Sequence, residues 1–128
     1  MTELDYAYLA EYAKVSEGLL TAVGASYTVV QAKELGRPFN LAVAGRIRAF
    51  EGESPTLGVE VFAPEERYQV GLAAQLSSAG ARPYGDGQVG ILFALTLPIP
   101  LIDVGIYSVS LKLNDAECRV LRFEVEQA

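Results

Sequence analysis

The sequence predicts an all-β protein, a single antiparallel two-sheet β-sandwich of about eight strands. Three consecutive stretches near the C-terminus carry this prediction, because apolar side chains recur at every second position in each of them. The first has its apolar face at Val89, Ile91, Phe93, Leu95 and Leu97. Alternation of this kind is typical of an antiparallel sheet that is covered on one side only.

The two stretches that follow repeat the same alternation. We expect Pro98 and Pro100 to end the first strand, because proline has no N–H to donate to a ladder. The second strand is predicted over Val104 to Leu113, and Asn114-Asp115 forms the turn after it. The inward positions of the last strand are Leu121, Phe123 and Val125.

Residues 4 to 15 fit two different structures. A helix would have one apolar stripe, made of Leu4, Tyr8, Tyr12 and Val15. A strand would instead line one face with Tyr6, Tyr8 and Tyr12. We predict a strand over Leu4 to Ala13, paired within the sandwich, because Ser16-Glu17-Gly18 then makes a hairpin connection to Leu19–Val23.

Four further strands are predicted in the middle of the chain. They cover residues 25–31, 39–47, 57–61 and 68–76. On the second of them, Arg46 and Arg48 face away from the apolar positions. Residues 77–87, rich in glycine and serine, predict the longest irregular loop. There are no internal repeats or linkers, so residues 1–128 are expected to form one domain.

The charge distribution argues against two kinds of partner. The formal net charge is −6, and the only close basic pairs are Arg46/Arg48 and Arg119/Arg122. Nucleic-acid-binding proteins normally carry a basic stripe that neutralises phosphates. We therefore expect no nucleic-acid partner, and the same balance argues against an anionic membrane surface.

The absence of histidine excludes several chemistries. It removes the usual general base and the commonest zinc ligand. Together with a single cysteine, Cys118, it leaves no structural zinc site. The loop aspartates Asp86, Asp103 and Asp115 lack calcium-loop spacing and are interpreted as turn formers. We therefore expect no enzymatic activity, no metal and no cofactor.

The cellular location is expected to be the cytoplasm. A single cysteine allows no intrachain disulfide, as is typical of a reducing compartment. The first residues are acidic where a secretory signal would be basic, and no apolar run is long enough to span a membrane.

Three segments of the chain are distinctive: LDYAYLAEYA at residues 4–13, GLLTAVG at 18–24 and PLIDVGIY at 100–107. Together they resemble a family of small bacterial single-domain β-sandwich proteins of unknown function. The resemblance implies a β-sandwich whose last hairpin begins with Gly-x-Tyr, here Gly105 and Tyr107. It implies no activity and no catalytic residues.

Three groups of residues are candidates for specific roles. Tyr6, Tyr8 and Tyr12 form a candidate protein-interaction surface, since tyrosine is enriched in interfaces. Arg82, Tyr84 and Asp86 are candidates for ligand contacts in the 77–87 loop. Gly105 and Tyr107 are interpreted as structural, with the Tyr107 ring in the core and its hydroxyl bonded to nearby backbone.

These observations favour a non-enzymatic cytoplasmic protein-interaction or assembly module, which binds a protein partner or self-associates through exposed strand edges. The first alternative is a β-sandwich that binds a small ligand or carbohydrate through the 77–87 loop. The second alternative is an accessory protein of a phage or a defence system.

Overall fold

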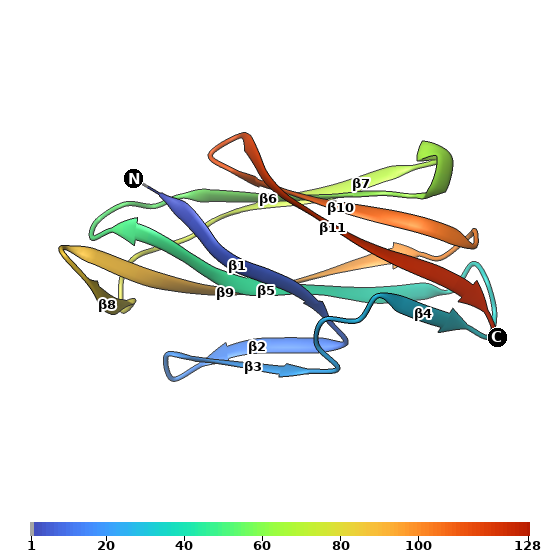
Figure 1. The fold of residues 1–128 in the computed structure, drawn as a ribbon, viewed down its shortest axis with the longest axis horizontal. Helices are drawn as coiled ribbons and strands as arrows, with labels where there is room; N and C mark the ends of the chain where they lie inside the picture. Colours follow the sequence, from blue (N-terminus) through green and yellow to red (C-terminus); the bar gives the residue numbers. More distant parts are fainter. Residues whose placement is uncertain (1) are drawn as a thin grey trace.

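The core lies between two β-sheets that face each other (Figure 1). The structure, a computed structural model, describes residues 2–128. One sheet has four strands, in the order β1 (Glu3–Ala10), β5 (Pro38–Phe50), β9 (Gln88–Pro100) and β8 (Arg82–Gly85). The other has five, in the order β4 (Val29–Ala32), β11 (Ala116–Gln127), β10 (Gly105–Leu113), β6 (Thr56–Phe62) and β7 (Gln69–Gln75).

The remaining two strands form a small third sheet. They are β2 (Tyr12–Ser16) and β3 (Leu19–Val23), and a short 3₁₀ turn, η1 (Pro64–Glu66), connects β6 to β7. The all-β prediction is confirmed. The predicted strand count of about eight is wrong, because residues 2–128 form eleven strands. The extra strands arise mainly at the N-terminal stretch and in the 77–87 loop.

The inner faces of the two large sheets supply the core. Its largest fully buried side chains come from both layers, and they include Leu41, Ile47 and Phe93 on one side and Val59, Leu111 and Phe123 on the other. The period-two alternation predicted for β5, β9, β10 and β11 thus points one set of side chains from each strand at the opposite sheet. The other set points outward.

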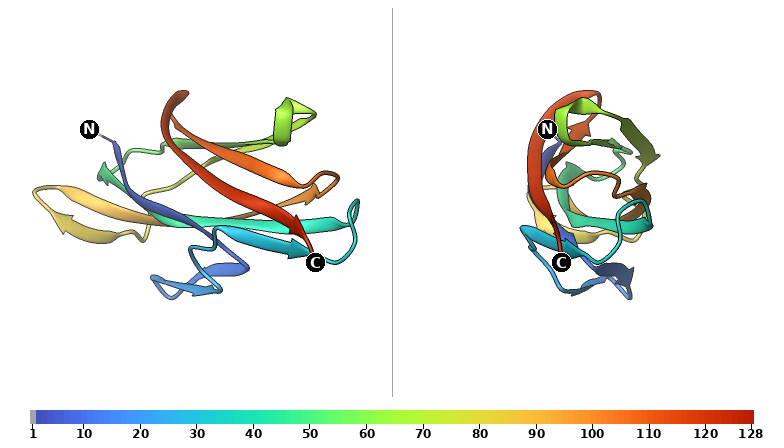
Figure 2. Two further views of the ribbon diagram at one scale, coloured as in Figure 1. Left: turned by 45° about the vertical axis from the view of Figure 1, so that its right-hand side comes forward. Right: turned by 90° about the vertical axis from the view of Figure 1, so that its right-hand side faces the viewer.

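The predicted strand over Leu4 to Ala13 is two strands. β1 pairs with β5 and ends at Ala10, the chain bends at Glu11, and β2 begins a hairpin with β3. The hairpin lies on the outer side of the four-stranded sheet (Figures 1 and 2). Small side chains allow this close approach, because the buried contact is made by Ala10, Ala13, Ala42 and Ala44.

The hairpin connection itself is confirmed. Glu17 and Gly18 have φ of 53° and 73°, the two positive values that a two-residue turn of type I′ requires. The predicted turn at Asn114 and Asp115 has the same character, with φ of 51° and 68°. The Asn114 side chain also accepts a hydrogen bond of 3.0 Å from the backbone N–H of Thr56, which fixes this turn to the start of β6.

Pro98 and Pro100 do not end their strand. β9 runs through both and pairs with Asn40 and Pro38 of β5. On its other side β9 pairs with β8 only over Gln88 to Gly90, so this edge is free at the prolines and a missing N–H costs no ladder bond there. The 77–87 segment is likewise not wholly irregular, because β8 lies within it.

Two further expectations are corrected in the five-stranded sheet. The predicted strand over residues 25–31 is β4, shorter and placed at Val29–Ala32, and it runs parallel to β11 rather than antiparallel. Val104 lies outside β10 and is 51% exposed. Gly105 has φ of 127°, which favours glycine, and β10 begins at this residue.

Tyr107 lies in the core near the start of β10. Its ring is 0% exposed and stacks on Phe123, with ring centroids 5.2 Å apart. Its hydroxyl donates a hydrogen bond of 2.9 Å to the backbone carbonyl of Asp103. This arrangement ties the loop before β10 to the strand, as the tyrosine corner does in other sandwiches.

We expect Tyr107→Phe to lower the free energy of unfolding by about 1 kcal/mol, because one buried hydrogen bond is lost while the ring is kept. Urea denaturation measures the change. The matched control is Tyr12→Phe, which alters a 54% exposed tyrosine and should stay within about 0.5 kcal/mol of the wild type. Equal midpoints for the two variants would contradict the structural role of the hydroxyl.

A β-bulge in β1 brings this strand unusually close to β5. The register shifts between Leu4, opposite Ile47, and Tyr6, opposite Arg46. Gly45 lies beside the bulge, and a Cβ atom there would stand 2.1 Å from the backbone oxygen of Tyr6 and 2.9 Å from the Phe93 ring. Glycine is therefore required at position 45 by space and not by its φ angle.

Gly45→Ala should consequently destabilise the fold by about 3 kcal/mol, because neither backbone oxygen nor packed ring can yield without moving β1. Gly58→Ala is the control, since a Cβ atom there meets its nearest neighbour at an ordinary 3.6 Å. Thermal unfolding followed by circular dichroism compares them. Equal melting temperatures for the Gly45→Ala and Gly58→Ala proteins would disprove the close approach of β1 to Gly45.

Candidate functional site

The bulge in β1 determines which side chains reach the outer face of the four-stranded sheet. Leu4 and Ala7 both pack against the core, so the two residues between them, Asp5 and Tyr6, both project outward. Without the bulge, alternation would send one of the two inward. Tyr8 follows on the same outer face and packs beside the alanine contact of the hairpin.

Tyrosine and arginine side chains form a continuous row across this outer face. The rings of Tyr8 and Tyr6 are nearly parallel, with centroids 6.4 Å apart and planes 7° apart. The Arg46 guanidinium lies 5.1 Å from the ring of Tyr6 and also 5.1 Å from the ring of Tyr84, and Arg48 lies 5.2 Å from Tyr84. Each such contact contributes about 0.5–1 kcal/mol at an exposed position. We call these five residues the Tyr–Arg row.

Two acidic side chains of β1 hold the arginines of the row in place. Asp5 accepts a hydrogen bond of 2.9 Å from Nε of Arg46 and lies 3.7 Å from Nε of Arg48. Glu3 lies 2.5 Å from Arg48, and this hydrogen bond raises the pKa of the Arg48 guanidinium above its usual range. Burial, followed by the neighbouring Tyr6, raises the pKa of the Tyr8 hydroxyl, so the row tyrosine stays neutral at physiological pH.

A hollow of about 330 Å³ opens beside the row. One wall is the tip of the β2–β3 hairpin, the opposite wall is β8, and the floor is made by β5 and β9. In Figure 1 the hairpin turn points toward β8. Gly90 makes room on the floor, since a Cβ atom there would stand 3.1 Å from the Arg46 side chain and 3.7 Å from the Tyr84 ring. The lining is Tyr6, Gly18, Leu19, Leu20, Arg46, Arg82, Pro83, Tyr84, Gly90 and Leu92.

The structure divides the two predicted candidate groups. Tyr6 and Tyr8 lie together, but Tyr12 is on β2 and outside the row, because the chain bends at Glu11. Arg82 and Tyr84 line the hollow, whereas Asp86, with φ of 53°, lies in the turn between β8 and β9. Two of the three residues in each group therefore contribute to one shared site.

Arg46 and Arg48 were not predicted as site residues. The sequence placed them on the outward face of a strand, but it gave no partner for them. Their partners come from residues 3–8 and 84, and only the pairing of β5 with β1 and of β9 with β8 brings these segments together. The signal available in the sequence for these two site residues was a pair of outward arginines at alternate positions of one strand, together with a tyrosine-rich strand near the N-terminus.

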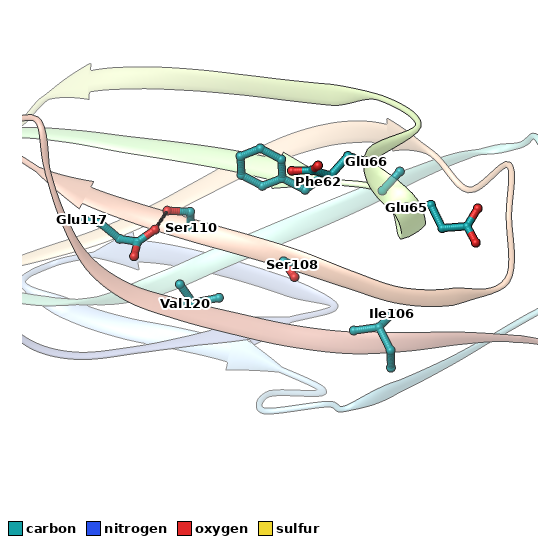
Figure 3. Close-up of a pocket in the computed structure, with 9 residues that line it drawn as sticks. Phe62, Glu65, Glu66, Ile106, Ser108, Ser110, Glu117 and Val120 are labelled. Carbon is teal, nitrogen blue, oxygen red and sulfur yellow. Dashed lines mark hydrogen bonds between the residues drawn. The ribbon is translucent and has the colours of Figure 1, made fainter.

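A second hollow, of about 490 Å³, lies on the outer face of the five-stranded sheet (Figure 3). Phe62, Ile106 and Val120 give it apolar patches, while Glu65, Glu66 and Glu117 make it acidic. The Ser110 hydroxyl donates a hydrogen bond of 2.8 Å to Glu117, so these two polar groups already satisfy each other. Within residues 2–128 its lining includes Phe62 but no tyrosine or arginine, so it lacks the groups that make up the Tyr–Arg row.

The described part of the chain gives few other chemical groups. Residues 2–128 hold no group of three or more Asp, Glu, Cys or His side chains placed to bind a metal ion. Cys118 is exposed, its thiol donates to the Leu111 carbonyl at 3.4 Å, and partial burial raises the pKa of the thiol. No helix within residues 2–128 has the length and apolar character needed to cross a membrane.

Comparison with known proteins finds a similarity in structure but not in sequence. No family model and no curated protein sequence matches this chain. The structure of Pseudomonas fluorescens alkylpurine DNA glycosylase AlkC, bound to DNA containing an abasic site analog, is similar with a TM-score of 0.40 and 14% sequence identity. The match covers 94% of this chain and 30% of the glycosylase chain, so this chain spans less than a third of that protein.

Two predictions from the sequence are corrected at this point. They are the protein-interaction or assembly function, with its two alternatives, and the set of partners that excluded nucleic acid. The similar structure was solved with DNA bound, which contradicts both predictions, and both are withdrawn. A likeness of this size transfers no activity to this chain, so any function must be argued from its own residues.

Proposed function

We propose that this chain is a nucleic-acid-binding module whose ligand site is the Tyr–Arg row with the hollow beside it. The observation that carries the proposal is the Arg46 guanidinium held between the rings of Tyr6 and Tyr84, at 5.1 Å from each. This places flat aromatic surface and positive charge side by side on one open face. A nucleotide presents the complementary pair of groups, a flat base and an anionic phosphate.

The shape of the face supports base stacking. Sheet surfaces with outward aromatic side chains hold unpaired bases in several nucleic-acid-binding folds, because every base offers a π-face. Here Tyr84 is 41% exposed, and Leu92 and Leu20 give the hollow an apolar lining. The contacts with Arg46 and Arg48 hold the Tyr84 ring in place before a ligand arrives, which reduces the entropy lost on binding.

The charge of the site determines how strong and how salt-sensitive the binding is. The site holds three arginines, Arg46, Arg48 and Arg82, and two carboxylates, Glu3 and Asp5, which leaves one net positive charge. With so few phosphate contacts, stacking at about 1–3 kcal/mol per base supplies most of the affinity. We therefore expect a dissociation constant on the order of 100 µM.

The proposed role is binding without catalysis in a cytoplasmic setting. The sequence contains no histidine, the most common general acid or base, and the thiol of Cys118 has a raised pKa and so little thiolate character. The free exposed thiol of Cys118 suits a reducing compartment.

Isothermal titration calorimetry with unlabelled oligothymidylate and with a short duplex tests the proposal. An unlabelled ligand is needed because many fluorescent dyes are themselves flat aromatic anions. We expect measurable binding at low salt, weakened about tenfold by Tyr84→Ala because one stacking surface is lost. Tyr12→Ala, which removes an exposed tyrosine outside the row, should leave the affinity unchanged. Absence of binding heat with both the oligothymidylate and the duplex would overturn the proposal.

A gain of affinity is expected from Asp5→Asn. The Asp5 carboxylate neutralises Arg46 and approaches Arg48, so its removal leaves more positive charge for a phosphate. We expect oligothymidylate to bind several-fold more tightly at low salt, with the advantage shrinking as salt is added.

Glu34→Gln is the control for Asp5→Asn, because it makes the same change in net charge at the exposed pair with Arg37, away from the row. A similar gain in both variants would assign the effect to overall charge. Thermal melting should be recorded for each, to show that the variant with the altered row remains folded.

A further inference from the structure

The hollow is a slot with two unequal walls. The hairpin tip contributes Gly18, Leu19 and Leu20 to one wall, and β8 contributes Arg82, Pro83 and Tyr84 to the other. The two walls belong to different sheets, so the slot exists only because the β2–β3 hairpin folds back on the outer face. Leu19 is 67% exposed and stands at the rim.

Arg82 differs from the other two arginines of the site. Arg46 and Arg48 are paired with carboxylates, whereas Arg82 takes part in none of the ion pairs found in residues 2–128. It donates a long hydrogen bond, 3.4 Å from Nη2 to the Glu17 carbonyl at the hairpin tip. A guanidinium has several N–H donors in a planar fork, so most of the capacity of Arg82 remains for an anion.

The hairpin turn packs closely against the guanidinium of Arg82. A Cβ atom at Gly18 would stand 2.7 Å from Nε of Arg82 and 3.0 Å from Nη2. Glycine at the turn therefore serves both the positive φ of 73° and the close approach of Arg82. The result is an exposed guanidinium that contacts the hairpin tip and lines the same slot as Tyr84.

We propose that the slot accepts one unpaired nucleotide, with its base on Tyr84 and its phosphate on Arg82, and that the module thereby selects single strands over duplex. This inference rests on the proposed function and names the form of its ligand. A base within a duplex is covered on both faces by its neighbours, so it offers no free face to Tyr84. The hairpin tip, which contacts Arg82 of β8 at the Glu17 carbonyl, also lines the slot and limits the space beside Tyr84.

The salt dependence of binding separates the two contacts. If Arg82 holds a phosphate, Arg82→Gln should weaken binding of oligothymidylate several-fold at low salt and reduce the slope of log affinity against log salt by about 0.7. Tyr84→Ala should weaken binding at every salt concentration and leave that slope unchanged. Arg122→Gln is the matched control for charge, since it removes an exposed arginine from β11 on the other sheet.

Calorimetric titrations at several salt concentrations, with the intact chain and each variant, measure these slopes. The expected result is binding of oligothymidylate at least tenfold tighter than that of the duplex, with the slope lowered only by Arg82→Gln. Equal affinity for duplex and single strand, or an unchanged slope in Arg82→Gln, would overturn this inference while the proposed function stood. Failure of both nucleic acids to bind would overturn the proposed function as well.

Thymidine monophosphate is the third ligand for these titrations. If it binds as tightly as oligothymidylate and loses the same affinity on Arg82→Gln, one nucleotide accounts for the whole contact, as the slot geometry requires. If it does not bind while the oligonucleotide does, the contact extends along the strand and the one-nucleotide slot is wrong.

Discussion

The long antiparallel ladder between β5 and β9 is the constraint on which the rest of the structure depends. It pairs Pro38 with Pro100 at one end and Phe50 with Gln88 at the other, without a break in register. Because side chains alternate along each strand, this ladder sends one set of side chains into the core and the other set onto the outer face. A slip of one residue would exchange the two sets, so the hydrophobic core and the outer face are fixed by the same ladder.

The outer face of this ladder changes in character along its length. At one part it presents Ala42 and Ala44, and their small side chains let the β2–β3 hairpin lie against the sheet. At another part it presents Arg46 and Arg48, where the sheet is left open and tyrosines of β1 and β8 approach from both sides. The hairpin therefore covers one part of the face and borders the other, which turns an open sheet into a slot.

Local departures from regular strand geometry position the side chains of the site. The bulge in β1 turns both Asp5 and Tyr6 outward, and it requires glycine at position 45 because the backbone of β1 comes so near. A second irregularity in β8, between Pro83 and Gly85, lies at Tyr84 itself. Bulges commonly redirect side chains at sheet edges. Here one at each edge of the four-stranded sheet brings a tyrosine ring to the same arginine, Arg46.

The sequence by itself determined the all-β class, most of the strands and the faces they bury, because period-two alternation is a local property that pairs each apolar position with the core. It also determined the hairpin at Glu17-Gly18 and the turn at Asn114-Asp115, since positive φ depends on the residues at the turn. The sequence could not determine the break at Glu11, the strand within residues 77–87 or the continuation of β9 through its prolines, because each depends on which neighbour a strand edge meets. For the same reason Tyr6, Tyr8, Arg82 and Tyr84 could be singled out as separate groups, but their assembly around Arg46 was decided only by the tertiary structure, where strand pairing brings residues distant in the chain onto one face.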